Sequence, residues 1–87
     1  MQIQHQDNQQ QGEFFICDET GQKIAYLTYQ YLRSDCINAD RTFVDECLRG
    51  QGVAHQLFLA LMDFVQQKQL TLRTSCAYIE QKVRSKI

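Results

Sequence analysis

The sequence predicts a mixed α/β domain with the element order β-β-β-α-β-α. Apolar and polar residues alternate over several segments of the first half, as they do in strands with one buried face. Residues 53–68 instead repeat apolar side chains at steps of three and four, which is typical of a helix that buries one stripe. The length of 87 residues suits one small domain, so residues 1–87 are expected to form a single unit.

Three strands are expected before the helix. Residues 13–17 form a short apolar run, and a turn at residues 18–21 follows, with a glycine where positive φ is needed. The third strand is expected over residues 36–44, which favour strand formation, and residues 1–12 indicate an early edge strand or a frayed tail. The second strand, residues 23–31, alternates regularly and would place on one face Ala25, Leu27, Tyr29 and Tyr31.

The helix at residues 53–68 is expected to be central in the fold, because its apolar surface is broad. A fourth strand is expected over residues 70–75, and a last helix is expected over residues 77–87. A strand–helix–strand succession is a βαβ unit, so residues 36–44 and 70–75 should run parallel in one sheet. The helix stripe consists of Ala54, Leu57, Phe58, Leu61, Phe64 and Val65, widened by Leu59, Ala60 and Met62.

Composition excludes several classes of function. A net charge of −1 argues against a protein that coats nucleic acid, and no apolar run is long enough to span a bilayer. The N-terminus lacks the pattern of a signal peptide, so we expect a cytoplasmic protein with reduced thiols. No C-x-x-C pair occurs, so no metal site is expected. Three cysteines are expected to act only in packing: Cys17, Cys36 and Cys47.

The distribution of charge is uneven along the chain. Most acidic residues lie before residue 49, and most basic residues follow it. This asymmetry favours an anionic ligand on the second half or a cationic group on the first. A solvated basic helix at the C-terminus explains it equally well.

The segment Arg49-Gly50-Gln51-Gly52-Val53-Ala54 is the most informative one, because it joins the third strand to the helix. Its two glycines allow a tight turn and a close approach of a ligand to the backbone. The first N–H groups of a helix have no intrahelical acceptor and lie at the positive end of the helix dipole. Together with a permanently charged arginine, these features predict a phosphate-binding loop.

This loop also matches the pattern [Arg/Gln]-x-x-Gly-x-[Gly/Ala], the pyrophosphate loop of the GNAT superfamily of N-acetyltransferases. From about Gly12 onward, the chain resembles the very short GNAT-like group. The shared features are a Phe-rich first strand, an alternating strand with aromatics, and two spaced motifs. The motifs here are Thr42-Phe43-Val44 followed by Leu48-Arg49-Gly50-Gln51-Gly52-Val53-Ala54, and Ser75-Cys76-Ala77-Tyr78-Ile79.

The resemblance implies a minimal GNAT-like fold that binds acetyl-CoA and transfers the acetyl group to an amine, releasing CoA. The pyrophosphate would bind the backbone of residues 49–54, and the pantetheine arm would follow the strand near Thr42, Phe43 and Val44. The thioester would then lie where this strand and residues 70–75 splay apart. The acceptor would be a protein or a small molecule. Its site would be open, or completed by a second subunit or a partner.

The resemblance makes Cys76 the candidate catalytic residue, either as the acid that protonates the leaving thiolate or as an acetyl carrier. Packing of a small buried cysteine is the alternative. A backbone N–H near Phe43 or Val44 would polarise the carbonyl, with Tyr78 a weaker acid candidate. Carboxylates that would accept the amine proton, or simply face solvent, are Asp40, Asp45 and Glu46.

Other polar side chains near the implied site have two interpretations each. His55, Lys68 and Arg73 would either contact phosphate groups or face solvent. The tyrosines at positions 26, 29 and 31 would line an acceptor groove or pack on the sheet.

Arg41 departs from the group, which usually has His there, and a guanidinium cannot serve as a base. Ala77 stands where the group usually has proline. These departures keep two alternatives open. One is a module that binds CoA or acetyl-CoA without turnover. The other is an interaction domain in which the glycine loop is only a tight turn.

Overall fold

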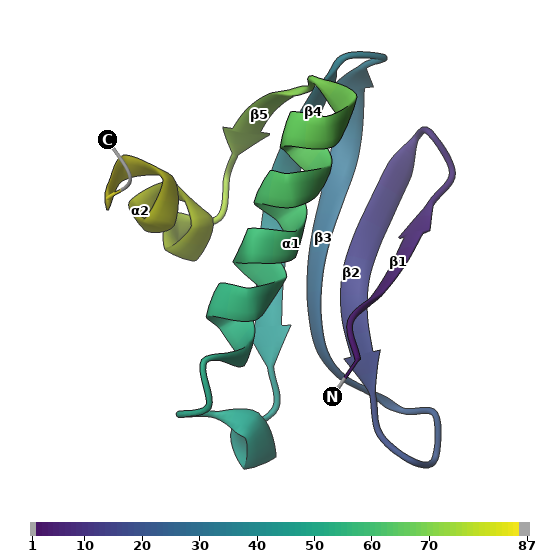
Figure 1. The fold of residues 1–87 in the computed structure, drawn as a ribbon, viewed down its shortest axis with the longest axis vertical. Coiled ribbons are helices and arrows are strands. Elements are labelled where there is room, and N and C mark those ends of the chain that lie inside the picture. The colour runs from purple at the N-terminus through teal and green to yellow at the C-terminus, as the bar shows by residue number, and fades with distance from the viewer. Residues whose placement is uncertain (1, 86–87) are drawn as a thin grey trace.

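A computed structural model describes residues 2–85 and shows a five-stranded sheet with two α-helices (Figure 1). The strands lie in the sheet in their order along the chain, from β1 at one edge to β5 at the other. The elements are β1 (Gln4–Asp7), β2 (Gln11–Cys17), β3 (Lys23–Arg33), β4 (Cys36–Val44), a 3-10 helix η1 (Glu46–Leu48), α1 (Val53–Lys68), β5 (Thr71–Thr74) and α2 (Ala77–Ser85).

The sheet topology confirms the predicted βαβ unit. Strands β1 to β4 pair antiparallel, and β5 pairs parallel to β4 after the crossover through α1. Of the two predictions for residues 1–12, the edge strand holds, because β1 adds a fifth strand beside β2. The structure also shows η1 where a plain loop was expected. The end of the predicted last helix, residues 86–87, lies outside the described residues.

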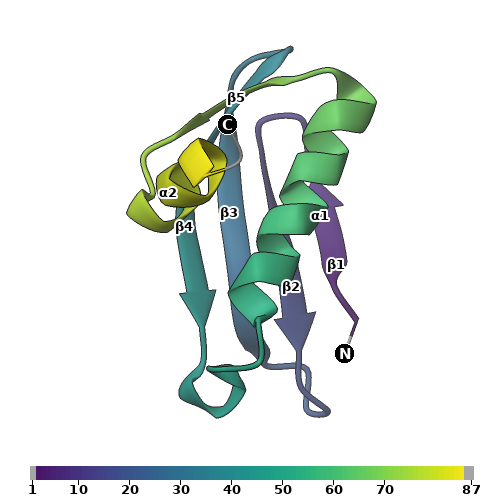
Figure 2. The same cartoon turned by 60° about the vertical axis from the view of Figure 1, so that its left-hand side comes forward.

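Both helices lie on one face of the sheet (Figures 1 and 2). The buried stripe of α1 packs on the inward face of β3, and Ile79 of α2 joins the same apolar cluster. Of the three residues expected to widen the stripe, Ala60 and Met62 pack against the core, but Leu59 remains 43% exposed. The helix covers one sheet face, and its far side meets solvent. The inward face of β3 consists of Ala25, Leu27 and Tyr29, with Tyr31 partly buried.

A hydrogen-bonded cluster fastens the edge strand β1 to β3. The hydroxyl of Tyr29, which is 1% exposed, donates to Asp7 Oδ2 at 2.5 Å, and the hydroxyl of Tyr31 donates to the same atom at 2.8 Å. His5 Nε2 lies 2.7 Å from Tyr29 Oη. Since the single hydroxyl proton of Tyr29 is used on Asp7, His5 Nε2–H must be the donor. The imidazole also stacks on Phe14.

This cluster should make stability depend on pH. Burial lowers the pKa of His5, so the unfolded chain binds its proton more readily than the folded one. Burial opposes ionisation of Asp7, but hydrogen bonds from Tyr29 and Tyr31 hold the pKa of Asp7 below its usual value. Burial and the Asp7 carboxylate raise the pKa of Tyr31 to about 12 and that of Tyr29 as well, so both hydroxyls keep their protons.

We therefore expect the free energy of unfolding to fall as pH drops below about 6.5, the ordinary pKa of histidine. The contribution of Asp7 is lost only later, below about pH 4. Urea unfolding at several pH values should show this decrease in the free energy of unfolding below about pH 6.5 in the wild type. His5→Phe, which keeps a stacking ring, should not show that decrease. His55→Gln, at an exposed position, is the matched control. An unchanged pH slope in His5→Phe would contradict this account.

Gly12 is required by the close packing of Tyr29. A Cβ at position 12 would overlap the phenol of Tyr29 and lie 2.7 Å from the carbonyl oxygen of Gln6. Gly12→Ala should therefore reduce the free energy of unfolding by about 1–3 kcal/mol, measured by urea denaturation. Gly21→Asn is the control, because its side chain would point into open space and asparagine tolerates positive φ. An equal loss in both variants would show that packing on Tyr29 is not the cause.

Candidate functional site: the gap between β4 and β5

The two parallel strands of the βαβ unit part after a short contact. β4 pairs with β5 from Cys36 to Ala39, and the N–H of Ser75 donates to the carbonyl of Ala39 at 3.0 Å. Beyond this bond, within residues 2–85, the strand pairing of β4 up to Val44 is with β3 alone. β5 pairs with β4 over its whole length and ends at Thr74, so the chain leaves the sheet here instead of the two strands splaying apart as predicted. This leaves one edge of β4 open beside the start of α2.

Three polar side chains fasten the point where the strands part. The hydroxyl of Thr74 lies 2.8 Å from the carbonyl oxygen of Ala39 and accepts the N–H of Cys76 at 3.0 Å. Asn38 Nδ2 donates to Ser75 Oγ at 3.2 Å. Thr74 and Asn38 were not among the predicted site residues, although a Thr-Ser pair at a strand end is a recurrent way to satisfy backbone groups. They fix the direction in which the chain leaves β5.

Cys76 comes directly after this point and lies next to the open edge of β4. Its Sγ is 3.8 Å from Thr42 Oγ1, and the residue is partly buried. Thr42 pairs with Leu27, so its side chain is on the face that carries the helices. The structure thus brings together two of the predicted site residues that are 34 positions apart.

The glycine loop lies at the other end of the same edge. The carboxylate of Asp45 caps η1 by accepting the N–H of Cys47, and Leu48 inserts into the core. Gly50 and Gly52 both have positive φ, 84° and 73°. Arg49 Nε donates to the carbonyl of Val44 at 3.4 Å, which ties the loop back to β4. The loop is therefore anchored on both sides and starts α1 in a defined direction.

The loop residues fit a phosphate group. Gly52 is the N-cap of α1 and has no side chain to cap the helix, so the first N–H groups of α1 receive no hydrogen bond from their own cap residue. A Cβ at Gly50 or Gly52 would have no heavy atom within 4 Å among the described residues. The space over these two glycines is open to a ligand, and Arg49 is exposed beside it.

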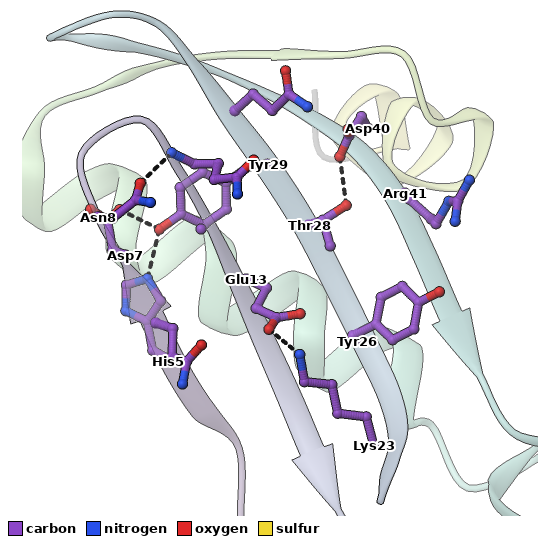
Figure 3. A pocket seen from close by; sticks show the side chains of 14 residues that line it. His5, Asp7, Asn8, Glu13, Lys23, Tyr26, Thr28, Tyr29, Asp40 and Arg41 are labelled. Carbon is purple, nitrogen blue, oxygen red and sulfur yellow. Dashed lines mark hydrogen bonds and ion pairs between the residues drawn. The ribbon is translucent and has the colours of Figure 1, made fainter.

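The outward face of the sheet, opposite the helices, holds a second part of the site (Figure 3). An open cavity of about 1040 Å³ runs over this face, with Tyr26, Thr28, Asp40 and Arg41 in its lining. The hydroxyl of Thr28 donates to Asp40 Oδ1 at 2.6 Å. The cavity lies on the opposite side of β4 from Thr42 and Cys76.

Several predicted roles need correction. The three tyrosines do not all line one groove. Tyr26 and Tyr29 both line the outward cavity, but Tyr29 is 1% exposed and packs in the core, and Tyr31 is not among the lining residues. Tyr26 stacks on Phe43 on the outward face at 5.3 Å. Alternation along β3 sends Tyr26 to the side of the sheet opposite Tyr29 and Tyr31. The Phe43 side chain is thus on the outward face as well, and only its backbone runs along the open edge with Thr42 and Val44.

The carboxylates and thiols also separate by position. Cys47 is exposed on η1, so the prediction that it packs in the core is wrong, whereas Cys36 is buried as expected. Asp45 hydrogen-bonds the N–H of Cys47, which lowers the pKa of Asp45 and makes it a weaker base. Its carboxylate in turn raises the pKa of the Cys47 thiol. Burial raises the pKa of Tyr78. Side chains that face solvent are Glu46, His55, Lys68 and Arg73.

The described residues contain neither a metal-binding cluster nor a membrane-spanning helix. Among residues 2–85, no group of three or more histidine, cysteine, aspartate or glutamate side chains is placed to hold a metal ion. No helix in that range is long and apolar enough to cross a membrane.

Comparison with known proteins defines the class. Residues 13–86 match the sequence model of the GCN5-related N-acetyl-transferase family. The chain belongs to this family, whose members generally use acetyl-CoA or another acyl-CoA.

Curated relatives include protein NATD1 of Xenopus tropicalis, which is 35% identical over 60 residues, 69% of this chain and 55% of that protein. Human protein NATD1 is 33% identical over 60 residues, which cover 69% of this chain and 53% of that protein. The chain spans about half the length of these curated relatives.

Solved structures show the same fold. A GCN5-like protein from Staphylococcus aureus superposes with a TM-score of 0.75 at 27% identity, over 98% of this chain and 79% of that chain. A ribosomal-protein-alanine N-acetyltransferase from Brucella melitensis superposes with a TM-score of 0.60 at 16% identity, over 82% and 58%. At 16% identity, the similarity to the Brucella protein concerns the fold alone. The predicted GNAT-like α/β fold is confirmed.

Proposed function

We propose that the protein binds acetyl-CoA along the open edge of β4 and transfers the acetyl group to an amine. The observation that carries this proposal is the alignment of three features on one edge. These are the glycine loop at the start of α1, the unpaired segment of β4, and the Cys76 thiol beside Thr42. Membership of an acyltransferase family supports the reaction class.

Each feature has a separate task in this proposal. The N–H groups at residues 49–54 bind the pyrophosphate, helped by the guanidinium of Arg49. The backbone of residues 42–44, which lacks a strand partner on the β5 side, binds the amide groups of the pantetheine arm. A backbone N–H near Phe43 or Val44 polarises the carbonyl, because an oriented donor in a confined site stabilises developing negative charge. Sequence reasoning assigned these nine positions, and the geometry is consistent with the assignment.

Acetyl-CoA, when bound, supplies an acetyl group activated as a thioester, so that the amine nitrogen forms a C–N bond while the C–S bond breaks. Cys76 gives its thiol proton to the departing sulfur and regains a proton from solvent. Asp40, on the outward side of the same strand, accepts the proton lost by the amine. Asp45 is less suited to this task, since it caps η1. The acetylated amine and CoA are the products.

A first experiment tests binding. Titration with acetyl-CoA should shift the amide NMR signals of residues 42–44 and 49–54 and raise the melting temperature as mass action requires. Gly52→Asp adds a negative charge and a side chain at the helix start, so it should weaken binding at least tenfold. Gly21→Asp is the matched control, because Gly21 also has positive φ and open space. Binding that is equal in both variants would leave the glycine loop as a mere turn.

A second experiment separates turnover from binding. Cys76→Ala should keep the affinity for acetyl-CoA and lower kcat by roughly 10²–10⁴-fold, the usual contribution of a positioned acid. Cys17→Ala, which removes another partly buried thiol, is the control. Normal binding with no transfer to any amine by the wild type would instead identify a module that senses the cofactor. Unchanged kcat in Cys76→Ala would make this cysteine a packing residue.

A further inference from the structure

A β-bulge places two opposite charges on the same face of β4. Thr28 pairs with Arg41 and Tyr29 with Ala39, so Asp40 is an extra residue in the strand. Neighbouring residues of a regular strand point to opposite faces, but a bulge breaks this alternation. As a result, Asp40 and Arg41 both line the outward cavity (Figure 3).

The protein leaves these two charges without an ionic partner. Within residues 2–85, neither Asp40 nor Arg41 forms an ion pair. Asp40 is positioned by the hydroxyl of Thr28 at 2.6 Å, and Arg41 is exposed. The remaining charged groups in the cavity are already engaged.

Two interactions account for those groups. Lys23 and Glu13 pair with each other. Asp7 accepts the hydroxyls of Tyr29 and Tyr31. The cavity therefore presents one available carboxylate and one available guanidinium, next to each other in sequence and facing the same space.

An aromatic surface adjoins the two charges. Tyr26 lines the cavity and stacks on Phe43 with 5.3 Å between ring centroids and 29° between ring planes. Phe43 is 39% exposed, so the pair forms a flat apolar wall that remains open to a ligand. Short methylene chains pack favourably on such a wall, and an ammonium group gains a cation–π contact there.

We propose that the outward cavity binds an amine that also carries an anionic group, a carboxylate or a phosphate. The ammonium lies at Asp40, and the anion forms a forked contact with Arg41. This inference rests on the proposed function for the identity of the ligand as acetyl acceptor. Asp40 follows Ala39, whose carbonyl accepts the N–H of Ser75, so an amine bound at Asp40 lies where β4 becomes open on the β5 side.

The test is a binding comparison that needs no acetyl-CoA. Amide NMR titrations use two matched pairs, 4-aminobutanoate against 4-aminobutanamide and phosphoethanolamine against ethanolamine. We expect shifts at residues 28, 40 and 41 and at least tenfold tighter binding of the anionic member in a pair. The preferred pair tells whether the anion is a carboxylate or a phosphate. Equal affinities within both pairs, or no binding of any member at millimolar concentration, overturn the inference.

Two variants assign the preference to its residues. Arg41→Gln should remove the difference within each pair and leave unchanged the binding of the two amines that lack an anionic group, whereas Arg41→Lys should retain part of the difference. Asp40→Asn should weaken both members of a pair. Arg33→Gln removes the same charge from an exposed position outside the cavity and serves as the control. A preference that survives in Arg41→Gln contradicts the assignment.

Transfer assays with the same pairs separate this inference from the proposed function. With acetyl-CoA present, the anionic member should show the higher kcat/KM, and Arg41→Gln should abolish that advantage. If acetyl-CoA does not bind but the anionic amines still do, the proposed function fails and the cavity assignment stands. If the amines that lack an anionic group are acetylated as well as those that carry one, the function stands and the cavity assignment fails.

Discussion

The parting of β4 and β5 is the constraint on which the rest of the structure depends. Backbone groups at a strand edge must find partners, and here the pairing ends at the Ala39–Ser75 hydrogen bond. The hydroxyl of Thr74 then holds the backbone of Cys76 and turns the chain out of the sheet. A longer β5 would cover the edge of residues 40–44 and carry Cys76 into the strand. The shortness of β5 therefore creates both the open edge and the position of the thiol.

The strand β4 serves two faces at once because of its bulge. On the helix face, Thr42 meets Cys76, and the strand continues toward the glycine loop. On the outward face, the extra residue brings Asp40 beside Arg41. A regular strand would have sent one of these two side chains toward the buried helix face, where an unpaired charge is costly. The bulge thus gives a small sheet two chemically different surfaces on one strand.

Local periodicity explains how much of the fold the sequence predicted. The bounds of α1 and β4 agree with prediction, because the helix has a strong period of 3.6 and residues 36–44 are rich in strand-favouring types. The parallel pairing followed from the strand–helix–strand succession, because a helical crossover returns the chain parallel to the first strand. Periodicity could not reveal the bulge at Asp40 or the contact of Asp7 with Tyr29, which depends on residues 22 positions apart. Leu59 was predicted to widen the buried stripe, yet it is 43% exposed. A helix pattern does not show whether a second layer packs on the far side of the helix.

The candidate site was predictable where one segment carries the chemistry and not where two segments meet. The glycine loop was visible as a contiguous motif, and its positive φ values agree with that interpretation. The roles of Thr74, Asn38 and Ser75 depend on where two distant strands end, which no single segment contains. The helices cover only one sheet face (Figure 2), so Thr42 and Cys76 at the open edge of β4 lie on the helix side, and the cavity of Figure 3 lies on the other side. In the proposed function, the thioester and the amine would approach the open edge from these two sides, so neither would have to displace the other.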